Sequence, residues 1–314
     1  IESAYPNPSS SDSFWNASAE NLLGVLLKAV HNMPPELKNL GFVHELLTRF
    51  GFEPETVNGI LNQYFTEANR NRFMGFLALE DKMKNSVLAT TQTALKAMSD
   101  PNLLEISSSH SLNFEKLRTS KQILFIRVRE DLISRFQFFL GVFFSQLFEF
   151  LMQEPVIGQP YNSVLLLLEE AGNIYVPSLD KLVNTIRKRG VSTSLLLQDN
   201  QQLEALYGKN KASAILNGGM TSKIIYPGVS IETCELFERM LGAKTVQLKE
   251  HGFGSINSEQ KNRMIDQGRS LMTAEEIRTM KDHHLFVSAA SKPILLKTYP
   301  YYKIPELVKR SNLR

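Results

Sequence analysis

The stretch that most constrains the fold is Val164–Asn173, which begins with five branched apolar residues in a row. Such an uninterrupted run is typical of a strand buried on both faces of a parallel sheet. Two acids, Glu169 and Glu170, follow the run directly. The carboxyl ends of parallel strands open into the crevice where α/β proteins bind ligands. Because like charges beside a low-dielectric core are unfavourable, the adjacent acids call for a functional explanation.

Two interpretations of these acids stay open on this stretch alone. In the first, the run is the Walker B strand of a P-loop-type ATPase. Glu169 then holds Mg²⁺, directly or through water, and Glu170 orients and deprotonates the attacking water. In the second, a buried strand ends in solvated acids at a loop.

The next segment brings a third polar side chain to the same place. Residues 178–190 carry apolar side chains at the spacing of one helix face, with Ser178 as a candidate N-cap and Gly190 as a left-handed end. Val191–Leu197 is a second candidate buried strand and ends at Gln198. A strand–helix–strand unit of this kind makes the two strands parallel, so Gln198 should lie beside Glu169 and Glu170.

The run from Leu165 to Gln198, followed by Q-L-E-A-L-Y-G, resembles the coupling-protein ATPases of conjugation and type IV secretion, the TraG/TraD type. Asn7-Pro8 and Asp12-Ser13-Phe14-Trp15 resemble the N-P and D-P-F-W segments of that family, and residues 269–277 resemble its R-P-L-L-T-x-x-E-I/V segment. These matches occur in the family's order and cover most of the chain.

The resemblance implies a RecA-like P-loop NTPase core with a mostly parallel sheet, interrupted by an all-α domain. It implies ATP and Mg²⁺ as cofactors and a ring, a hexamer, as the assembly. The cargo would be single-stranded DNA with its attached relaxase, or protein effectors, delivered to a type IV secretion channel from the cytoplasmic side of the bacterial inner membrane. Alternatives are a double-stranded DNA translocase of the FtsK/HerA kind and a nucleotide-independent scaffold that binds secretion substrates.

The chain departs from the family at two points. The family has Asp-Glu where this chain has Glu169-Glu170, and the longer side chain changes the position of the carboxylate that would face the metal. No G-x-x-x-x-G-K-[ST] occurs in the 314 residues. In the family this motif lies upstream, so we expect a fragment without the P-loop and the membrane anchor, and ATP hydrolysis by this chain stays an open question.

The resemblance and the residue chemistry give each candidate a role. Glu170 is the expected general base, Glu169 the metal-side carboxylate, and Gln198 a sensor of the γ-phosphate or a positioner of water. Gln198 is otherwise a polar strand end. Arg187 and Arg189 lie on the last turn of the helix, where the helix dipole favours cations. The resemblance implies that one of them acts across a subunit boundary as an arginine finger.

Periodicity predicts the remaining organisation. Residues 1–34 and 105–314 are expected to form the nucleotide-binding domain, and residues 35–104 an all-α insertion. The first helix is expected at residues 16–30, and those of the insertion at 43–50, 55–67, 71–79 and 82–98. Expected strands cover residues 123–128 and 223–226, with a closing hairpin of 284–290 and 293–299. Residues 251–268 are expected to be a polar loop.

Composition adds few constraints. The net charge is +3, a mildly basic balance that permits a nucleic-acid or acidic partner without requiring one. Cys234 is the single cysteine, which excludes an internal disulfide. The six histidines show no metal-ligand spacing.

Overall fold

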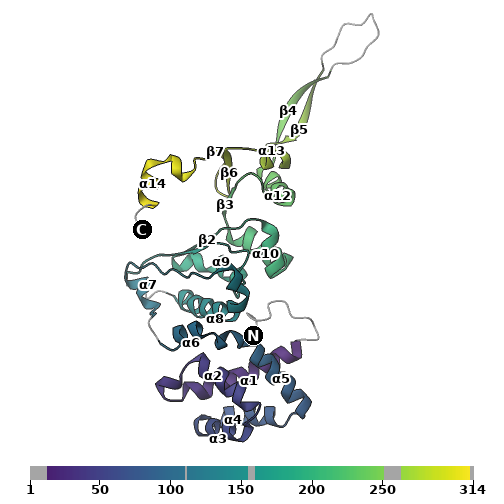
Figure 1. The fold of residues 1–314 in the computed structure, drawn as a ribbon. Helices are drawn as coiled ribbons and strands as arrows, with labels where there is room; N and C mark the ends of the chain where they lie inside the picture. The colour runs from purple at the N-terminus through teal and green to yellow at the C-terminus, as the bar shows by residue number, and fades with distance from the viewer. Residues whose placement is uncertain (1–12, 110–111, 155–159, 251–262, 312–314) are drawn as a thin grey trace, which may run out of the picture.

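The computed structural model describes residues 13–109, 112–154, 160–250 and 263–311. Three hydrophobic cores hold these residues together. Figure 1 shows a helical unit at the bottom, the β1–β2 region above it, and a smaller antiparallel sheet at the top. The fold is mixed α/β, in agreement with the fold class expected from the sequence.

Residues 35–104 contain no strand, as expected, and the five α-helices that begin in this range form the helical unit together with α1. Side-chain caps begin several of them, because Asn39, Thr66 and Asp100 each accept a hydrogen bond from a backbone N–H of the first turn. The helices are α1 (Ser13–His31), α2 (Leu40–Phe50), α3 (Pro54–Tyr64), α4 (Glu67–Leu77), α5 (Asp81–Ala94) and α6 (Pro101–Ser107).

Helix α1 shares its buried side chains with α2–α5, and Leu22, Leu26 and Val30 all lie in the core of the helical unit. The buried contacts therefore group residues from 13 onward with the helical unit, whereas residues 1–34 were expected in the nucleotide-binding domain. The division into domains at residues 34 and 104 stays a prediction.

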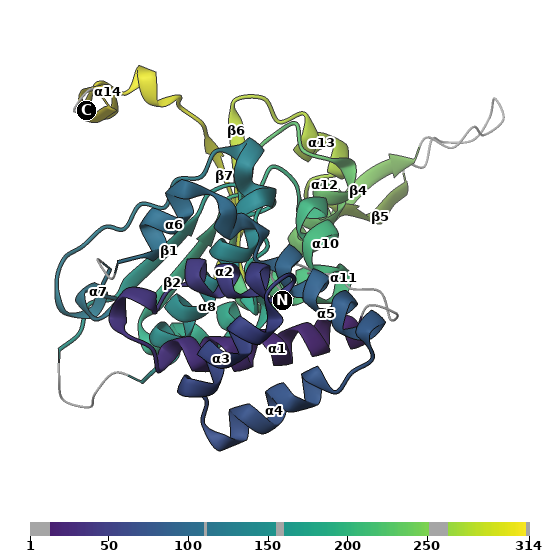
Figure 2. The same ribbon diagram turned by 60° about the horizontal axis from the view of Figure 1, so that its bottom comes forward.

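The second core surrounds a parallel strand pair. Strand β1 pairs with β2 from Val164↔Val191 to Leu168↔Leu195, and Figure 2 shows the two strands side by side. This confirms the expected strand–helix–strand unit. Its elements are α7 (Glu115–Thr119), α8 (Ile133–Met152), β1 (Val164–Leu168), α9 (Leu179–Thr185), β2 (Val191–Leu195), α10 (Asn200–Tyr207) and α11 (Lys209–Ser213).

The third core lies between a three-stranded antiparallel sheet of order β3-β6-β7 and two helices. The closing hairpin was predicted and is confirmed as β6–β7. The elements are β3 (Ser222–Ile225), α12 (Ile231–Leu241), β4 (Ala243–Glu250), β5 (Arg263–Ser270), α13 (Ala274–Arg278), β6 (His283–Ser288), β7 (Ile294–Lys297) and α14 (Pro305–Ser311).

Strand β1 is buried on one face only, which corrects the expectation of burial on both. Leu166 is buried, whereas Leu165 and Leu167 are 65% and 59% exposed. Side chains of α8 and α9 pack in the same core as Leu166. No helix or strand of the described residues covers the opposite face, so the alternate leucines face outward.

The prediction of a strand at residues 123–128 is wrong. The segment forms no strand, and its side chains Ile123 and Phe125 are 80% and 73% exposed. An apolar sequence favours a strand only where a neighbour supplies backbone hydrogen bonds. No strand within the described parts of the chain pairs with this segment.

The prediction of a polar loop at residues 251–268 is also partly wrong. Residues 263–268 belong to β5, which pairs antiparallel with β4 from Ala243↔Ser270 to Glu250↔Arg263. The backbone ladder, rather than an apolar pattern, stabilises this ribbon, which extends away from the body in Figure 1. Residues 251–262 lie outside the described residues.

The helix after Ser178 begins without the expected side-chain cap. Ser178 has a φ of 56° and makes no cap hydrogen bond, and α9 ends at Thr185. A 3₁₀ turn, Ile186–Arg189, continues the segment to Gly190, whose φ of 66° confirms the expected left-handed end. Among the described helices, none has the length and apolar character needed to cross a membrane.

Asp199 joins the second core to the third. Its carboxylate completes the expected capping box with Gln202 at the start of α10. The same carboxylate accepts hydrogen bonds from the backbone N–H of Ser230 at 2.9 Å and the hydroxyl of Thr233 at 3.1 Å, at the start of α12. Partial burial raises the pKa of Asp199, but these hydrogen bonds outweigh it and hold the pKa below its usual value.

We expect Asp199→Asn to lower the free energy of unfolding by about 2 kcal/mol at pH 7, because an amide nitrogen leaves one of these donors unpaired. The depressed pKa means that the carboxylate stabilises the fold above its unfolded pKa of about 3.9 and loses this effect as the pH falls through the folded pKa. Urea unfolding at pH 7 and near pH 3.5 measures both effects. The difference in the free energy of unfolding between parent and variant should be smaller at the lower pH. Asp282→Asn, at an exposed carboxylate, is the control.

Candidate functional site

The candidate site lies at the carboxyl edge of the β1–β2 pair. The backbone ladder continues past the strands, since Leu196 N–H donates to Leu168 O at 2.9 Å and Ala171 N–H donates to Leu196 O at 3.1 Å. This pairing brings the acids of β1 beside the end of β2. The Gln198 amide donates to Glu170 Oε2 at 3.1 Å. The expected neighbourhood of Glu170 and Gln198 is therefore present.

Glu170 adopts an unusual backbone conformation. Its φ of 52° lies in the left-handed region, which costs about 1–2 kcal/mol for a residue with a side chain. The following turn stabilises this conformation, because Asn173 N–H donates to Glu170 O at 2.9 Å. A strained residue at a ligand-facing sheet edge is a common feature of functional sites.

Asn173 is a site residue that the sequence interpretation missed. Its side-chain amide donates to Glu170 Oε2 at 3.3 Å, so this oxygen accepts hydrogen bonds from two amides. The sequence did carry a signal for this turn. Asn173 directly follows Gly172, three residues after Glu170, and glycine and asparagine are both common in turns. The turn places Asn173 against the carboxylate of Glu170.

The other acid, Glu169, is exposed to solvent. Within the described residues its side chain makes no hydrogen bond or ion pair. Neither Glu169 nor Glu170 is thus buried in an ion pair, an arrangement that would have contradicted a nucleotide-facing role.

Contacts with α8 and α10 hold the loop after β1. The backbone N–H of Val176 donates to the Tyr207 hydroxyl at 2.8 Å, and burial raises the pKa of Tyr207 to about 12. The Gln137 amide donates to Tyr175 O at 2.6 Å and accepts from Tyr175 N–H at 3.2 Å. Five residues beyond the acids, the chain is therefore anchored to two helices.

Gly172 lets α10 approach the loop that carries the acids. A Cβ at this position would collide with the Gln202 side chain, whose Cβ lies 2.6 Å from the ideal position. That side chain also accepts a hydrogen bond from Gln198 N–H at 3.2 Å. Because Gly172 has no side chain, Gln202 can pack against the turn that follows Glu170 and also bind the backbone of Gln198.

The two candidate arginines lie at the other end of the strands. Arg187 and Arg189 precede the first residue of β2, whereas Glu170 follows the last residue of β1. Five residues of strand separate these ends by about 16 Å. Arg189 approaches Glu154 at 3.9 Å, and its buried Nε has no hydrogen-bond partner among the residues that the structure describes. Within one chain, these arginines do not join the Glu170 site.

The site fits a nucleotide and Mg²⁺ in a limited way. No group of three or more metal-ligating side chains gathers among the described residues. However, Mg²⁺ usually keeps several waters and takes only one or two carboxylates beside the phosphates of its substrate. The solvent-facing Glu169 carboxylate meets that requirement, and Glu170 Oε1 accepts no hydrogen bond among the described residues.

Comparison with solved structures places the fold among conjugative coupling proteins. The bacterial conjugative coupling protein TrwBΔN70 superposes with a TM-score of 0.72 at 16% identity, over 95% of this chain and 66% of that chain. TrwB with a non-hydrolysable GTP analogue gives 0.70, and TrwB with ADP and Mg²⁺ gives 0.69, each at 16% identity over 95% of this chain and 66% of TrwB. The chain thus spans just under two thirds of TrwBΔN70, and the likeness shows a RecA-like P-loop NTPase fold.

A comparison with curated protein sequences gives no match. The sequence profile of a family does match, and it is described as type IV secretory system conjugative DNA transfer. The match covers residues 2–313, almost the whole chain. This coverage agrees with the resemblance found over the Leu165–Gln198 run, and the chain belongs to the type IV secretory system conjugative DNA transfer family.

Proposed function

We propose that this chain is the part of a coupling ATPase that carries the water-activating carboxylate, with Glu170 as general base. The hydrogen-bonded pair of Glu170 and Gln198 at the sheet edge is the observation that carries this proposal. The solved structures of TrwB with ADP and Mg²⁺, and with nucleotide analogues, support a nucleotide as the ligand.

The two oxygens of the Glu170 carboxylate have different roles in this proposal. Oε2 accepts hydrogen bonds from the amides of Gln198 and Asn173, which fixes the plane of the carboxylate. Oε1 then receives the proton of the attacking water. With its plane fixed by these two amides, the carboxylate presents Oε1 as the acceptor for that proton.

Gln198 and Glu169 complete the arrangement. Because the Gln198 amide nitrogen is committed to Glu170, its carbonyl oxygen remains to accept a hydrogen bond from the same water. Glu169 would hold Mg²⁺ directly or through water, and the ion supplies charge neutralisation at the phosphates when bound.

The proposed assembly is a ring, a hexamer, at the cytoplasmic side of the bacterial inner membrane. It would deliver relaxase-bound single-stranded DNA or protein effectors to a type IV secretion channel. The distance between Glu170 and the arginines supports a role in trans, since Arg187 or Arg189 of one copy would then complete the site of a neighbour. Family membership and the TrwB fold support these partners.

Glu170→Gln in the full-length protein should lower kcat for ATP hydrolysis by roughly 10²–10⁴-fold, the usual contribution of a general base, with little change in KM. Steady-state phosphate release measures the effect. Glu204→Gln, at an exposed acid on α10, is the matched control and should keep full turnover. Full turnover by Glu170→Gln would remove Glu170 as the base.

Asn173→Ala should lower kcat by roughly tenfold, because the carboxylate loses one of the two amides that orient it. Because the amide orients the carboxylate and does not bind the nucleotide in this proposal, KM for ATP should change little. Steady-state phosphate release by the full-length protein, with kcat and KM determined separately, checks this. Asn210→Ala, an exposed position on α11, is the control. An unchanged kcat, or a loss confined to KM, would contradict a positioning role for Asn173.

A further inference from the structure

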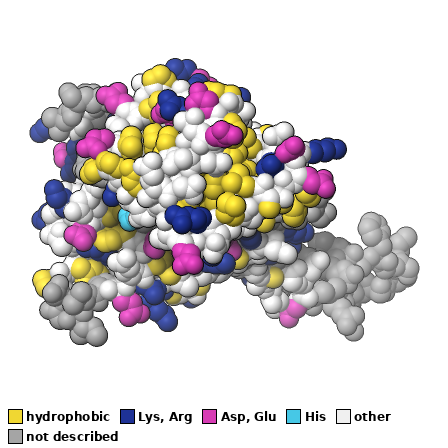
Figure 3. Space-filling view, turned by 90° about the horizontal axis from the view of Figure 1, so that it is seen from below, with side chains coloured by type: hydrophobic (Ala, Val, Ile, Leu, Met, Phe, Trp, Pro, Cys, Tyr) yellow, Lys and Arg dark blue, Asp and Glu magenta, His cyan; other side chains and the backbone are white. Residues whose placement is uncertain are grey.

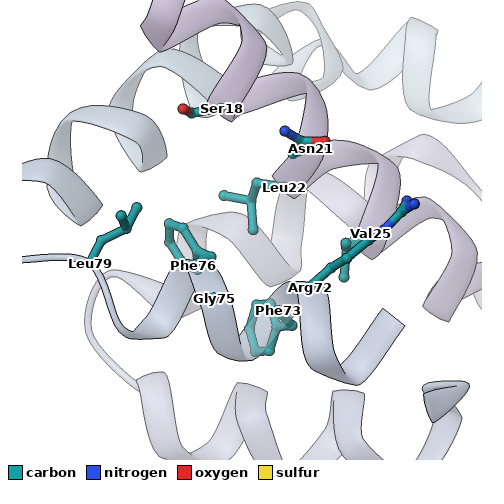
Figure 4. Close-up of a pocket in the computed structure, with 9 residues that line it drawn as sticks. All are labelled: Ser18, Asn21, Leu22, Val25, Arg72, Phe73, Gly75, Phe76 and Leu79. Atoms are coloured by element: carbon teal, nitrogen blue, oxygen red, sulfur yellow. The ribbon is translucent and has the colours of Figure 1, made fainter. Parts of the chain in front are cut away.

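A cavity of about 350 Å³ lies between α1 and α4 of the helical unit, and Figure 4 shows the side chains that line it. Its floor is formed by Leu22, Phe73 and Phe76, which are all buried, so it offers a partner almost no apolar surface. Figure 3 views the molecule from the side of this unit and shows charged side chains scattered among apolar ones. None of the side chains that line this cavity comes from the β1–β2 pair, so the geometry of the acids depends on contacts at the sheet edge itself.

One side chain at that edge binds the segment that follows β2. Gln202, on the first turn of α10, accepts hydrogen bonds at Oε1 from the backbone N–H of Gln198 at 3.2 Å and of Asp199 at 3.4 Å. The bond to Asp199 belongs to the capping box, a general way to begin a helix. The bond to Gln198 is not part of a capping box, and it is the shorter of the two. Capping of α10 therefore does not account for the whole contact.

The same side chain also packs against the loop that carries the acids. The Cβ and Cδ atoms of Gln202 each lie 2.6 Å from the position that a Cβ on Gly172 would occupy. The φ of Gly172 lies outside the left-handed region, so its backbone conformation does not itself call for glycine. It is the Gln202 side chain that excludes a larger residue here, two residues beyond Glu170.

Gln198 depends on this contact for its position. The backbone ladder between β1 and β2 ends at Leu196, two residues before Gln198. The Gln198 side chain is exposed, and among the described residues Gln202 Oε1 is the acceptor of its backbone N–H. Its amide must nevertheless reach Glu170 Oε2, at 3.1 Å. Because a misplacement of about 1 Å can lower a catalytic rate by about 10²-fold, a backbone anchor at this point bears on the chemistry.

We propose that Gln202 is a positioning residue for the pair of Glu170 and Gln198. Its side-chain carbonyl holds the Gln198 backbone at a fixed distance from the turn of Gly172, so that the Gln198 amide reaches the Glu170 carboxylate. The proposal rests on the proposed function, because the step that it supports is the activation of water by Glu170. Gln202 itself touches neither the water nor the nucleotide and acts through Gln198.

The test replaces Gln202 by methionine in the full-length protein, because methionine keeps the length of the side chain and offers only a weak sulfur acceptor. Steady-state phosphate release should show a kcat lowered by roughly tenfold, with little change in KM for ATP. Gln201→Met, at the exposed neighbour on the same turn of α10, is the matched control and should keep full turnover. An unchanged kcat in Gln202→Met, or a loss confined to KM, would overturn the proposal.

A double-mutant cycle separates positioning from helix capping. If Gln202 acts through the side chain of Gln198, then Gln202→Met should cause no further loss of kcat in a protein that already carries Gln198→Ala. A role confined to capping α10 would instead lower kcat by the same factor in both backgrounds. That result would also overturn the proposal.

Gly172→Ala reaches the same contact from the loop, and it carries the test if Gln202→Met does not fold. The new Cβ displaces the Gln202 side chain, so kcat should fall by a similar factor, and full turnover would contradict the proposal. Failure of the proposed function gives a different result, because Glu170→Gln would then keep full turnover. Loss of turnover in Glu170→Gln beside full turnover in Gln202→Met would refute the role of Gln202 alone.

Discussion

The candidate site depends on one interaction, the parallel pairing of β1 with β2. Its register sets Leu168 opposite Leu195, and the ladder continues to Ala171 and Leu196. A shift of one residue would turn Leu166 outward and move Gln198 along the edge, away from Glu170. Burial of Leu166 against α8 and α9 opposes such a shift. The packing of one leucine thus helps to determine which polar groups meet.

Sequence patterns predicted the parts of the structure that local preference determines. Helical periodicity located the helices between residues 35 and 104, and two apolar runs joined by a helix located Glu170 beside Gln198. Sequence patterns failed where the formation of a strand depends on whether a second segment pairs with it. The apolar segment at residues 123–128 lacks a partner strand, whereas the polar β5 acquires one in β4. Asn173 was missed because the left-handed turn at Glu170, which no periodicity encodes, brings it to the carboxylate.

Helix α8 links the two larger cores. Its Phe138 is buried in the helical unit, whereas Leu140 and Phe144 are buried with β1. Its Gln137 also holds the loop that follows the acids, through Tyr175. A partner bound to the helical unit could therefore bias the site only through a physical connection of this kind, and α8 provides one. The helical unit and the acids are otherwise built on separate cores.

The backbone of Glu170 works against the stability of the chain. Glycine, or to a lesser degree asparagine, occupies the left-handed region more easily than glutamate. A search for heat-resistant variants would therefore favour these residues at position 170, and the more stable variants would lack the carboxylate proposed as the base. A rise in melting temperature after substitution at this position would measure the free energy that the left-handed backbone of Glu170 costs the folded chain.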